Sequence, residues 1–417
     1  MKCLNILSFF IVFILLPLES CSTNNFPLEV NDSDSINVLS KAVCISKPTI
    51  ELSTHGSNMF INKKNQIAYV EYTSSEESKL EGPNANSYIA LSIFPVSDPS
   101  KKTIIKVAYP GQRIGNITIP ADKSLSDGNI YTIGDGYLII SFLSLSNYTY
   151  YYRKYNLSTG VLEDSLNYIK IKYKGEYKPM IGGYFVMAVN EFVGNKSKLP
   201  TTYLQMASRA IPYNGYFYIY VGGYLSSATN MFRGALLKSI DCINWEVVYV
   251  RPTKLGGYSY TETDILIKNG IIYCVQRHDN DNDSGMGTYL FSIDLSTLTA
   301  KDDILITPVG AQSTGRPAIF TDGKDIYIGA TSGNLVTPTG IVERSEYTIY
   351  KIVNITEPLK TERIVLLTNA CGIHYCSLCF DNYKLLITYS TDRRKINLSH
   401  PCTNIDFISF NWNEIKN

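Results

Sequence analysis

The sequence lacks an excess of charge of either sign. Its 38 lysine and arginine residues nearly balance 37 aspartate and glutamate residues, and the formal net charge is +1. The chain as a whole is therefore not expected to be attracted to nucleic acid or to a membrane surface, and any preference for an anion must come from local charges. At 45% hydrophobic and 18% charged residues, the chain can bury a large core and is not expected to be disordered.

Several patterns are also missing beyond the N-terminus. No later stretch is long and apolar enough to predict a membrane span, and none has a sustained apolar stripe at the 3.6-residue period of a helix. We therefore expect very little helix. The glycine patterns of nucleotide-binding loops, the Gly-x-Ser-x-Gly elbow of esterases and the His-Glu-x-x-His helix of zinc proteases do not occur, which argues against those enzyme classes.

The N-terminus has the features of a secretory signal. Lys2 precedes an apolar core from Leu4 to Leu18, and a polar stretch follows. Residues 1–20 are therefore predicted to be a signal peptide, residues 21–43 a polar tether and residues 44–417 a single folded domain. We expect a protein that is secreted or held at the cell surface.

The end of this signal carries a second pattern. Leu18-Glu-Ser-Cys21 resembles the lipobox of bacterial lipoproteins, in which Cys21 would become the lipidated first residue of the mature chain. Plain secretion, a lipid tether at Cys21 and a retained signal anchor are all compatible with the sequence.

Cysteines are present in a number that suits an exported protein. Of the nine, these seven follow Cys21: Cys44, Cys242, Cys274, Cys371, Cys376, Cys379 and Cys402. In an exported protein we expect some of them to form disulfides, with one thiol left over or paired with Cys21. The segment Cys371–Cys379, with His374 inside it, has the residue types of a zinc site, but its spacing is compressed. A local disulfide or buried thiols are the preferred interpretation.

Short runs rich in β-branched and aromatic residues follow one another along the chain, separated by clusters of Gly, Pro, Asn and Ser. They cover residues 65–72, 87–94, 103–109, 128–133, 136–142, 148–153, 168–173, 178–188, 209–221, 234–248, 260–278, 315–329, 377–389 and 405–410. Two passages, 260–278 and 315–329, each have a polar start, an apolar run, a Gly-containing turn and a second β-rich run. This order is typical of a β-hairpin.

Units of three or four such strands predict an all-β fold of the β-propeller type. Six blades fit best, and five or seven are kept as alternatives because the unit that begins at Lys178 is short. Cys44 and Cys402 lie near the two ends of the folded region. We expect both ends to contribute to one terminal blade, with these two cysteines close in space, and we expect a monomer.

Four units begin with a cation just before their first apolar run: Lys47, Lys178, Arg209 and Arg316. The innermost strand of a propeller blade starts near the central axis, so these cations are expected to converge on one cavity. The alternative is that basic residues at strand starts simply face solvent.

Two motifs carry a resemblance to a known family. The passage from Glu262 to Arg277 places a glutamate before an apolar hairpin and an arginine at its end. Ser239-Ile-Asp-Cys-Ile-Asn-Trp245 has the pattern of an Asp-box turn, with Cys242 where glycine is usual, and Ser292–Leu298 is a degenerate second copy. Over residues 235–350 the chain thus resembles the sialidase superfamily, a group of six-bladed propeller glycosidases.

The resemblance implies a set of roles. In such enzymes three arginines bind the substrate carboxylate, a tyrosine paired with a glutamate is the nucleophile, and an aspartate is the acid or base. On this sequence Glu262 would be the partner of the tyrosine, and Arg277 and Arg316 the second and third arginines. Tyr347 and Tyr350 are the candidates for the nucleophile.

The first part of the family pattern is incomplete. The nearest match to the first arginine is Lys47, although Arg209-Ala-Ile-Pro in mid-chain looks more like that motif. The region after Lys47 offers Asn62, Glu71 and Glu76 but no aspartate, so the acid or base is unassigned. The expected function is therefore a sialidase-like glycoside hydrolase acting on an anionic sugar of a glycan. The alternative is an inactive propeller that binds glycan or a protein partner through its central cavity.

One further segment alternates carboxylates, as calcium-binding loops do. Asp279, Asp281 and Asp283 lie in Asp279-Asn-Asp-Asn-Asp-Ser-Gly285, which lacks the glycine and the final glutamate of an EF-hand. Calcium in a different kind of loop is weighed against a solvated turn, and no other cofactor is expected.

Overall fold

The computed structural model describes residues 35–47, 51, 53–77, 86–122, 124–134, 136–194, 203–205, 209–224, 232–252, 259–279, 287–301, 304–306, 315–331, 335–337, 340–342, 344–354, 360–392 and 403–415. The chain divides into two units, Met1–Asn31, outside these ranges, and Asp32–Asn417, which holds every described residue. The predicted signal peptide and the lipidation site lie outside the described residues. No helix within the described ranges is long and apolar enough to span a membrane.

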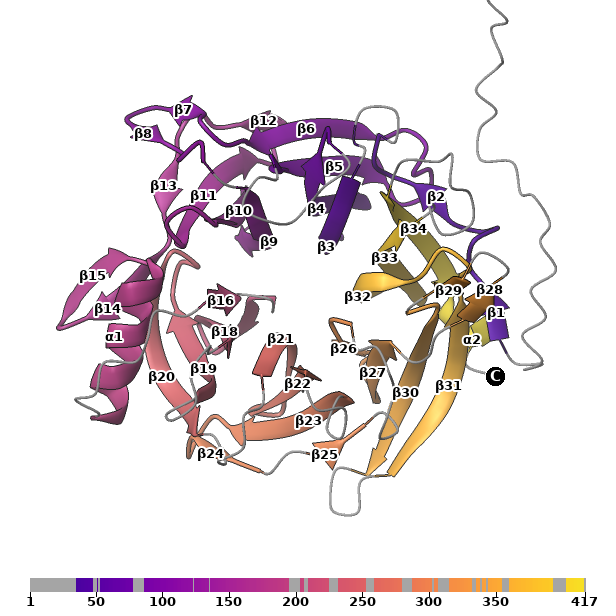
Figure 1. Cartoon of the computed structure of the whole chain (residues 1–417). Coiled ribbons are helices and arrows are strands. Elements are labelled where there is room, and N and C mark those ends of the chain that lie inside the picture. Colours follow the sequence, from indigo (N-terminus) through magenta and orange to yellow (C-terminus); the bar gives the residue numbers. More distant parts are fainter. Residues whose placement is uncertain are drawn as a thin grey trace, which may run out of the picture. The chain divides into compact units, whose positions relative to one another are not determined.

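The unit Asp32–Asn417 forms a six-bladed β-propeller, with the first strand of each blade nearest the central axis (Figure 1). The predicted all-β propeller is thus confirmed. Blade 1 contains β3 (Ser53–Asn62), β4 (Ile67–Ser75), β5 (Tyr88–Pro95) and β6 (Thr103–Ala108), followed by a small hairpin of β7 (Arg113–Ile114) and β8 (Ile117–Thr118). Blade 2 contains β9 (Leu125–Ile133), β10 (Tyr137–Ser144), β11 (Thr149–Asn156), β12 (Val161–Leu162) and β13 (Asn167–Tyr168).

The two middle blades are joined by one residue pair between their inner strands. Blade 3 contains β16 (Tyr203–Gln205), β17 (Ile211–Tyr213), β18 (Tyr216–Tyr224), β19 (Phe232–Ser239), β20 (Asn244–Pro252), β14 (Lys170–Tyr173) and β15 (Glu176–Pro179). Blade 4 contains β21 (Ser259–Lys268), β22 (Ile271–Asp279), β23 (Gly287–Asp294), β24 (Thr299–Ala300) and β25 (Ile304–Leu305).

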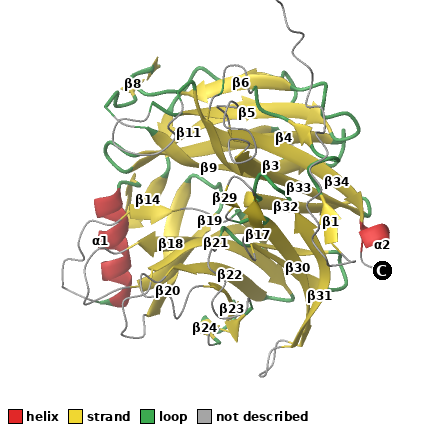
Figure 2. Ribbon diagram, turned by 45° about the vertical axis from the view of Figure 1, so that its right-hand side comes forward, coloured by secondary structure: helices red, strands yellow, loops and turns green. Residues whose placement is uncertain are grey.

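The last two blades each include a strand from the N-terminal region. Blade 5 contains β26 (Ala318–Thr321), β27 (Ile326–Thr331), β30 (Glu346–Asn354), β31 (Lys360–Thr368) and β1 (Ser35–Asn37), with a separate hairpin of β28 (Leu335–Thr337) and β29 (Gly340–Val342). Blade 6 contains β32 (His374–Asp381), β33 (Lys384–Asp392), β34 (Thr403–Asn411) and β2 (Val43–Cys44), and the short helix α2 (Trp412–Ile415) follows it. Figure 2 shows how strands dominate the structure.

The core lies between neighbouring blades, so the middle strands are apolar on both faces. On β4, Tyr69 packs with Leu138 and Phe142 of blade 2, whereas the adjacent Val70 packs with Leu386 of blade 6. Successive side chains of a strand point to opposite faces, and here each face meets another sheet. This explains why the strands appear in the sequence as continuous apolar runs.

The two hairpins predicted from the sequence are present. Asn269 and Gly270 join β21 to β22 with φ values of 54° and 76°, the two left-handed residues that a tight hairpin turn requires. The second hairpin pairs β26 with β27, with Thr321 opposite Ile326.

The turn between β19 and β20 is built around Asp241. Its carboxylate accepts hydrogen bonds from the backbone N–H groups of Ile243 and Asn244 at 2.9 and 2.8 Å. Burial acts to raise the pKa of Asp241, but these bonds outweigh it and the pKa lies below its usual value. Cys242 has a φ of 58°, a left-handed conformation that glycine adopts more readily, and the fully buried Trp245 donates its indole N–H to the Cys242 oxygen.

The ring is closed by the N-terminal region, as predicted. Val43 and Cys44 of β2 pair with Phe407 and Asp406 of β34, so both ends of the chain contribute to blade 6. Cys402, the expected neighbour of Cys44, lies outside the described residues. The folded region also begins earlier than the expected boundary at residue 44, because β1 pairs in parallel with β31 of blade 5.

The unit expected to start at Lys178 is not a blade. Lys178 and Pro179 end β15, and the following residues form helix α1 (Gly182–Val193), which packs against β14 and β20 on the outside of blade 3 (Figure 1). The buried residues Phe185, Val186 and Val189 recur at helical spacing, and Gly194 ends the helix in a left-handed conformation with φ 68°. The expectation of a strand is wrong here. The aromatic and β-branched residues favour a strand locally, but Phe185, Val186 and Val189 form a short apolar stripe at helical spacing. The stretch 374–411 supplies the sixth blade instead.

Of the two interpretations of the segment Cys371–Cys379, a local disulfide or buried thiols, the structure supports thiols. Cys376 and Cys379 carry thiols, as does Cys242. Burial raises the pKa of Cys376 and Cys379, which keeps both groups protonated. Cys376 lies in the hydrophobic core between blades 5 and 6, with Ala318 and Leu378.

Candidate central pocket

A small pocket lies where the inner strands of the blades meet. It is lined by Asn58, Arg209, Asp264, Arg316, Pro317, Cys376 and Ser377. These residues come from every blade except blade 2, and all lie on an innermost strand or immediately before one. Of the four cations expected to converge at the centre, Arg209 and Arg316 do so.

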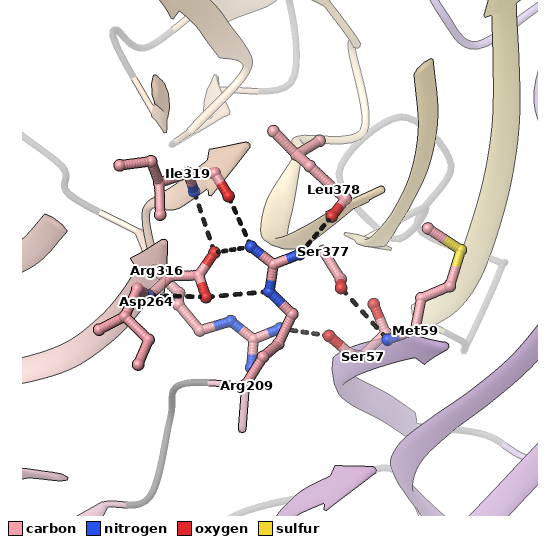
Figure 3. A network of polar contacts seen from close by, with 9 residues as sticks. Ser57, Met59, Arg209, Asp264, Arg316, Ile319, Ser377 and Leu378 are labelled. Atoms are coloured by element: carbon pink, nitrogen blue, oxygen red, sulfur yellow. Dashed lines mark hydrogen bonds and ion pairs between the residues drawn. The ribbon is translucent and has the colours of Figure 1, made fainter. Parts of the chain in front are cut away.

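Arg209 precedes β17 and makes four hydrogen bonds, all of them within the protein (Figure 3). Its Nε and Nη2 donate to the two carboxylate oxygens of Asp264 at 3.1 and 2.8 Å, a bidentate ion pair. Nη2 also donates to the backbone oxygen of Ile319 at 2.5 Å, and Nη1 to that of Leu378 at 3.0 Å. Arg209 was expected to bind substrate, but the structure gives its donors to the inner strands of blades 4, 5 and 6.

Arg316 precedes β26 and is only 7% exposed. Its Nη2 donates to the backbone oxygen of Ser57 in blade 1 (Figure 3) and to that of Tyr375 in blade 6. Both partners are carbonyl groups, and among the described residues no carboxylate pairs with Arg316, nor does any accept a hydrogen bond from its Nε or Nη1.

Glu262 and Arg277 form an ion pair across the hairpin of blade 4. Arg277 Nη1 lies 2.7 Å from Glu262 Oε2, and the two side chains are 15% and 4% exposed. Val275 packs against Ile319 and Ile328 of blade 5, and Arg277, two residues on, lies on the same face of β22. The pair therefore faces blade 5, whose first strand is preceded by Arg316.

The two tyrosines predicted as nucleophiles point to opposite sides of blade 5. Tyr347 is completely buried, with Cys376 and Leu378 of blade 6, so its hydroxyl cannot meet a substrate. Burial raises the pKa of Tyr347 well above its usual value, and the neighbouring charged groups are Asp264 and Arg316 rather than Glu262. Tyr350 packs toward blade 4, and burial raises its pKa as well.

The two lysines predicted to line the cavity do not line it. Lys178 lies on β15, the outermost strand of blade 3, and pairs with Glu176 there. Lys47 is exposed in the segment between β2 and β3, where its backbone N–H donates to Glu51 at 2.5 Å. The solvent-facing alternative holds for these two because their segments run along the outer strands.

Sequence reasoning missed Asp264 and Tyr375. Asp264 lies in an apolar strand, and a buried carboxylate there is expected to have a cationic partner. The sequence does not show that this partner is Arg209, because only the fold places the two residues together. Tyr375 is partly exposed at the start of β32, its ring centroid 4.0 Å from that of His55 and 5.5 Å from the guanidinium carbon of Arg344. The sequence did offer one indication of Tyr375: it stands just before the apolar run 377–389, as Arg316 stands just before the residues of β26.

Metal binding finds no further support within the described ranges. They contain no group of three His, Cys, Asp or Glu side chains suited to a metal ion. Asp281 and Asp283, proposed as calcium ligands, lie outside the described residues, as does the side chain of Asp279.

Sequence comparison identifies no relative of this chain. No family model matches it, and no curated protein matches it.

Comparison with solved structures does find similar propellers. A Trypanosoma rangeli sialidase mutant with trans-sialidase activity superposes with a TM-score of 0.54 at 12% identity, covering 86% of this chain and 54% of the sialidase. The T. rangeli sialidase itself gives a TM-score of 0.52 at 11% identity over 89% and 57%. This chain thus spans little more than half the length of these sialidases.

A shorter enzyme is covered almost completely. An α-L-arabinofuranosidase from Fusarium graminearum gives a TM-score of 0.52 at 11% identity, over 90% of this chain and 99% of the enzyme. The similarity thus extends well beyond the residues 235–350 that carry the sequence motifs. The chain has the six-bladed β-propeller fold of the sialidases.

Proposed function

We propose that the chain is a glycoside hydrolase that acts at the central pocket on an anionic sugar of a glycan. The observation that carries this proposal is the state of Arg316. Arg209 is neutralised by Asp264 and Arg277 by Glu262, whereas the buried Arg316 contacts only carbonyl groups among the described residues. A buried guanidinium without a counter-ion is costly, and the Nε–H and Nη1–H groups of Arg316 remain available for hydrogen bonds to the carboxylate of a bound ligand.

The fold supports the hydrolytic part of the proposal. Two groups of enzymes with this fold cleave glycosidic bonds, and one neighbour is a sialidase in complex with sialic acid, a carboxylated sugar. Glycoside hydrolysis needs a group that attacks the anomeric carbon and a carboxyl group that manages protons. We assign these roles to Tyr375 and Glu262, because the Tyr375 backbone oxygen accepts a hydrogen bond from Arg316 and its side chain is partly exposed, whereas Tyr347 is buried.

The test is turnover of fluorogenic substrates with a sialosyl, a glucuronosyl or an arabinofuranosyl group. We expect cleavage of one acidic substrate, a loss of about 100-fold or more in kcat for Glu262→Gln and Tyr375→Phe, and a rise in KM for Arg316→Lys. Glu246→Gln is the matched control, because Glu246 pairs with Lys172 and Lys238 on the outside of blade 3. Full activity in Glu262→Gln would remove the assigned role.

A second function is favoured because most polar groups of the pocket are already hydrogen-bonded to other groups of the protein. Arg209 and Asp264 are committed to each other and to backbone groups, which leaves mainly the Nε–H and Nη1–H groups of Arg316 for a ligand, in a pocket with little room. Such a pocket suits an inactive propeller that holds an anionic glycan end. Binding of sialic acid in calorimetry without turnover, lost in Arg316→Met, would favour this second function.

A further inference from the structure

The side chain of Arg209 links four blades of the propeller, its own and three others. Arg209 comes from the start of blade 3, and its four hydrogen bonds reach Asp264 of blade 4, the Ile319 oxygen of blade 5 and the Leu378 oxygen of blade 6 (Figure 3). The sequence separations to these partners are 55, 110 and 169 residues. Among the residues that the structure describes, no strand pairing joins the inner strands of blades 4, 5 and 6 directly.

The carboxylate of Asp264 completes this link. Besides Arg209, it accepts the backbone N–H of Ile319 at 2.9 Å and that of Ile265 at 3.0 Å. Its side chain is 8% exposed, so these donors satisfy a nearly buried charge. Blade 4 is thereby fixed to blade 5 through a carboxylate and to blade 3 through a guanidinium.

The geometry requires an arginine. The acceptors on Asp264, Ile319 and Leu378 lie in different directions, and only a planar guanidinium presents enough fixed donors to reach all of them. The ammonium of a lysine is compact and would reach the carboxylate while leaving backbone oxygens of the inner strands without a donor.

We infer that Arg209 is a positioning residue that ties the inner strands of blades 3 to 6 together and forms the base of the pocket, and that it does not bind the ligand. Arg316 extends the link to blade 1 through the Ser57 oxygen, but only with one of its nitrogens. This division of roles is independent of whether the pocket catalyses a reaction.

The experiment compares Arg209→Lys and Arg209→Met with Arg153→Met. Arg153 is a matched control, because it also donates to backbone oxygens, those of Val107 and Glu163, but in blades 1 and 2 away from the pocket. Thermal unfolding and hydrogen exchange by mass spectrometry are measured on the full chain. We expect a melting temperature about 5–10 °C lower for each Met variant.

The inference is tested by which peptides lose protection from hydrogen exchange. Arg209→Met and Arg209→Lys should lose protection in peptides from β21, β26 and β32, and Arg153→Met in peptides from β6 and β11. Methylguanidinium at about 10 mM, far below denaturing concentration, should restore protection to Arg209→Met, while methylammonium should not. If Arg209→Lys kept wild-type protection in β26 and β32, or if both cations restored Arg209→Met equally, the inference would be overturned.

Discussion

Arg277 Nη1 donates a hydrogen bond to Glu262 Oε2 at 2.7 Å, across the hairpin that β21 and β22 form in blade 4. The two residues were expected to act separately, one on a substrate carboxylate and one on a tyrosine. Their ion pair means that each residue sets the charge environment of the other.

The first prediction concerns this pair. Arg277→Met removes the cation beside a carboxylate that is only 4% exposed, and we expect it to lower the free energy of unfolding by about 2–4 kcal/mol. The double variant Glu262→Leu/Arg277→Met should be more stable than Arg277→Met alone, because no buried charge is then left over. Urea unfolding of the single and double variants measures this coupling, and strictly additive effects would contradict it.

The second prediction concerns pH and Asp322. Burial acts to raise the pKa of Asp322, but hydrogen bonds from the backbone N–H of Asp325, the Tyr327 hydroxyl and the Trp412 indole lower it to about 2. The ionised group therefore stabilises the fold above about pH 4, and this contribution is lost as the pH falls toward 2.

Asp322→Asn should accordingly cost about 1 kcal/mol at neutral pH, a value kept small because the site is partly solvated. The difference from wild type should shrink between pH 4 and pH 2 in urea unfolding. Asp164→Asn, at an exposed position, serves as the control for a general effect of charge. A constant difference across this pH range would count against the assignment.

The third prediction concerns close packing beneath Tyr347. A Cβ added to Gly329 would lie 2.6 and 2.7 Å from ring atoms Cε1 and Cζ of Tyr347, which is buried and cannot move aside. Gly329→Ala should therefore destabilise the protein by about 1–3 kcal/mol. Gly183→Ala in helix α1 is the control: a Cβ there meets no atom within 4 Å, so thermal stability should be unchanged or slightly raised.

The fourth prediction concerns the turn at Asp241. Asp241→Ala removes the acceptor for Ile243 and Asn244 and should cost about 1–3 kcal/mol. Cys242→Gly should change stability by less than about 1 kcal/mol, because relief of the left-handed conformation offsets the loss of a buried thiol. Thermal unfolding of the two variants tests the turn, and a neutral Asp241→Ala would show that the carboxylate is dispensable.

The features that could be predicted from the sequence are those set by neighbouring residues. Asn269-Gly270 predicts a hairpin because both residues tolerate positive φ. The recurrence of such hairpins along the chain is enough to predict a propeller. Helix α1 was missed because its residues 182–187, Gly-Gly-Tyr-Phe-Val-Met, favour a strand locally. Packing on β14 and β20 makes the segment helical, and that information lies in residues distant along the chain.

The pocket could be predicted only in part for the same reason. The positions of Arg209 and Arg316 before inner strands follow from the repeat, and both were expected at the centre. Whether each one binds the protein or faces the pocket depends on carbonyl groups of other blades. Tyr347 was expected at the site because a tyrosine should follow Arg316 in the same blade, but its side chain is buried against Cys376 and Leu378 of blade 6.

The pairing of β2 with β34 has a consequence for how the molecule is made. The Ile405 N–H donates to the Ser46 hydroxyl across 359 residues of sequence, so the ring cannot close until nearly the whole chain has been synthesised. Contacts this distant along the sequence slow folding. Until they form, β34 presents an unpaired sheet edge, the kind of surface through which two nascent chains associate. A chain that ends before residue 403 would lack β34 and would leave the edge of β33 unpaired permanently.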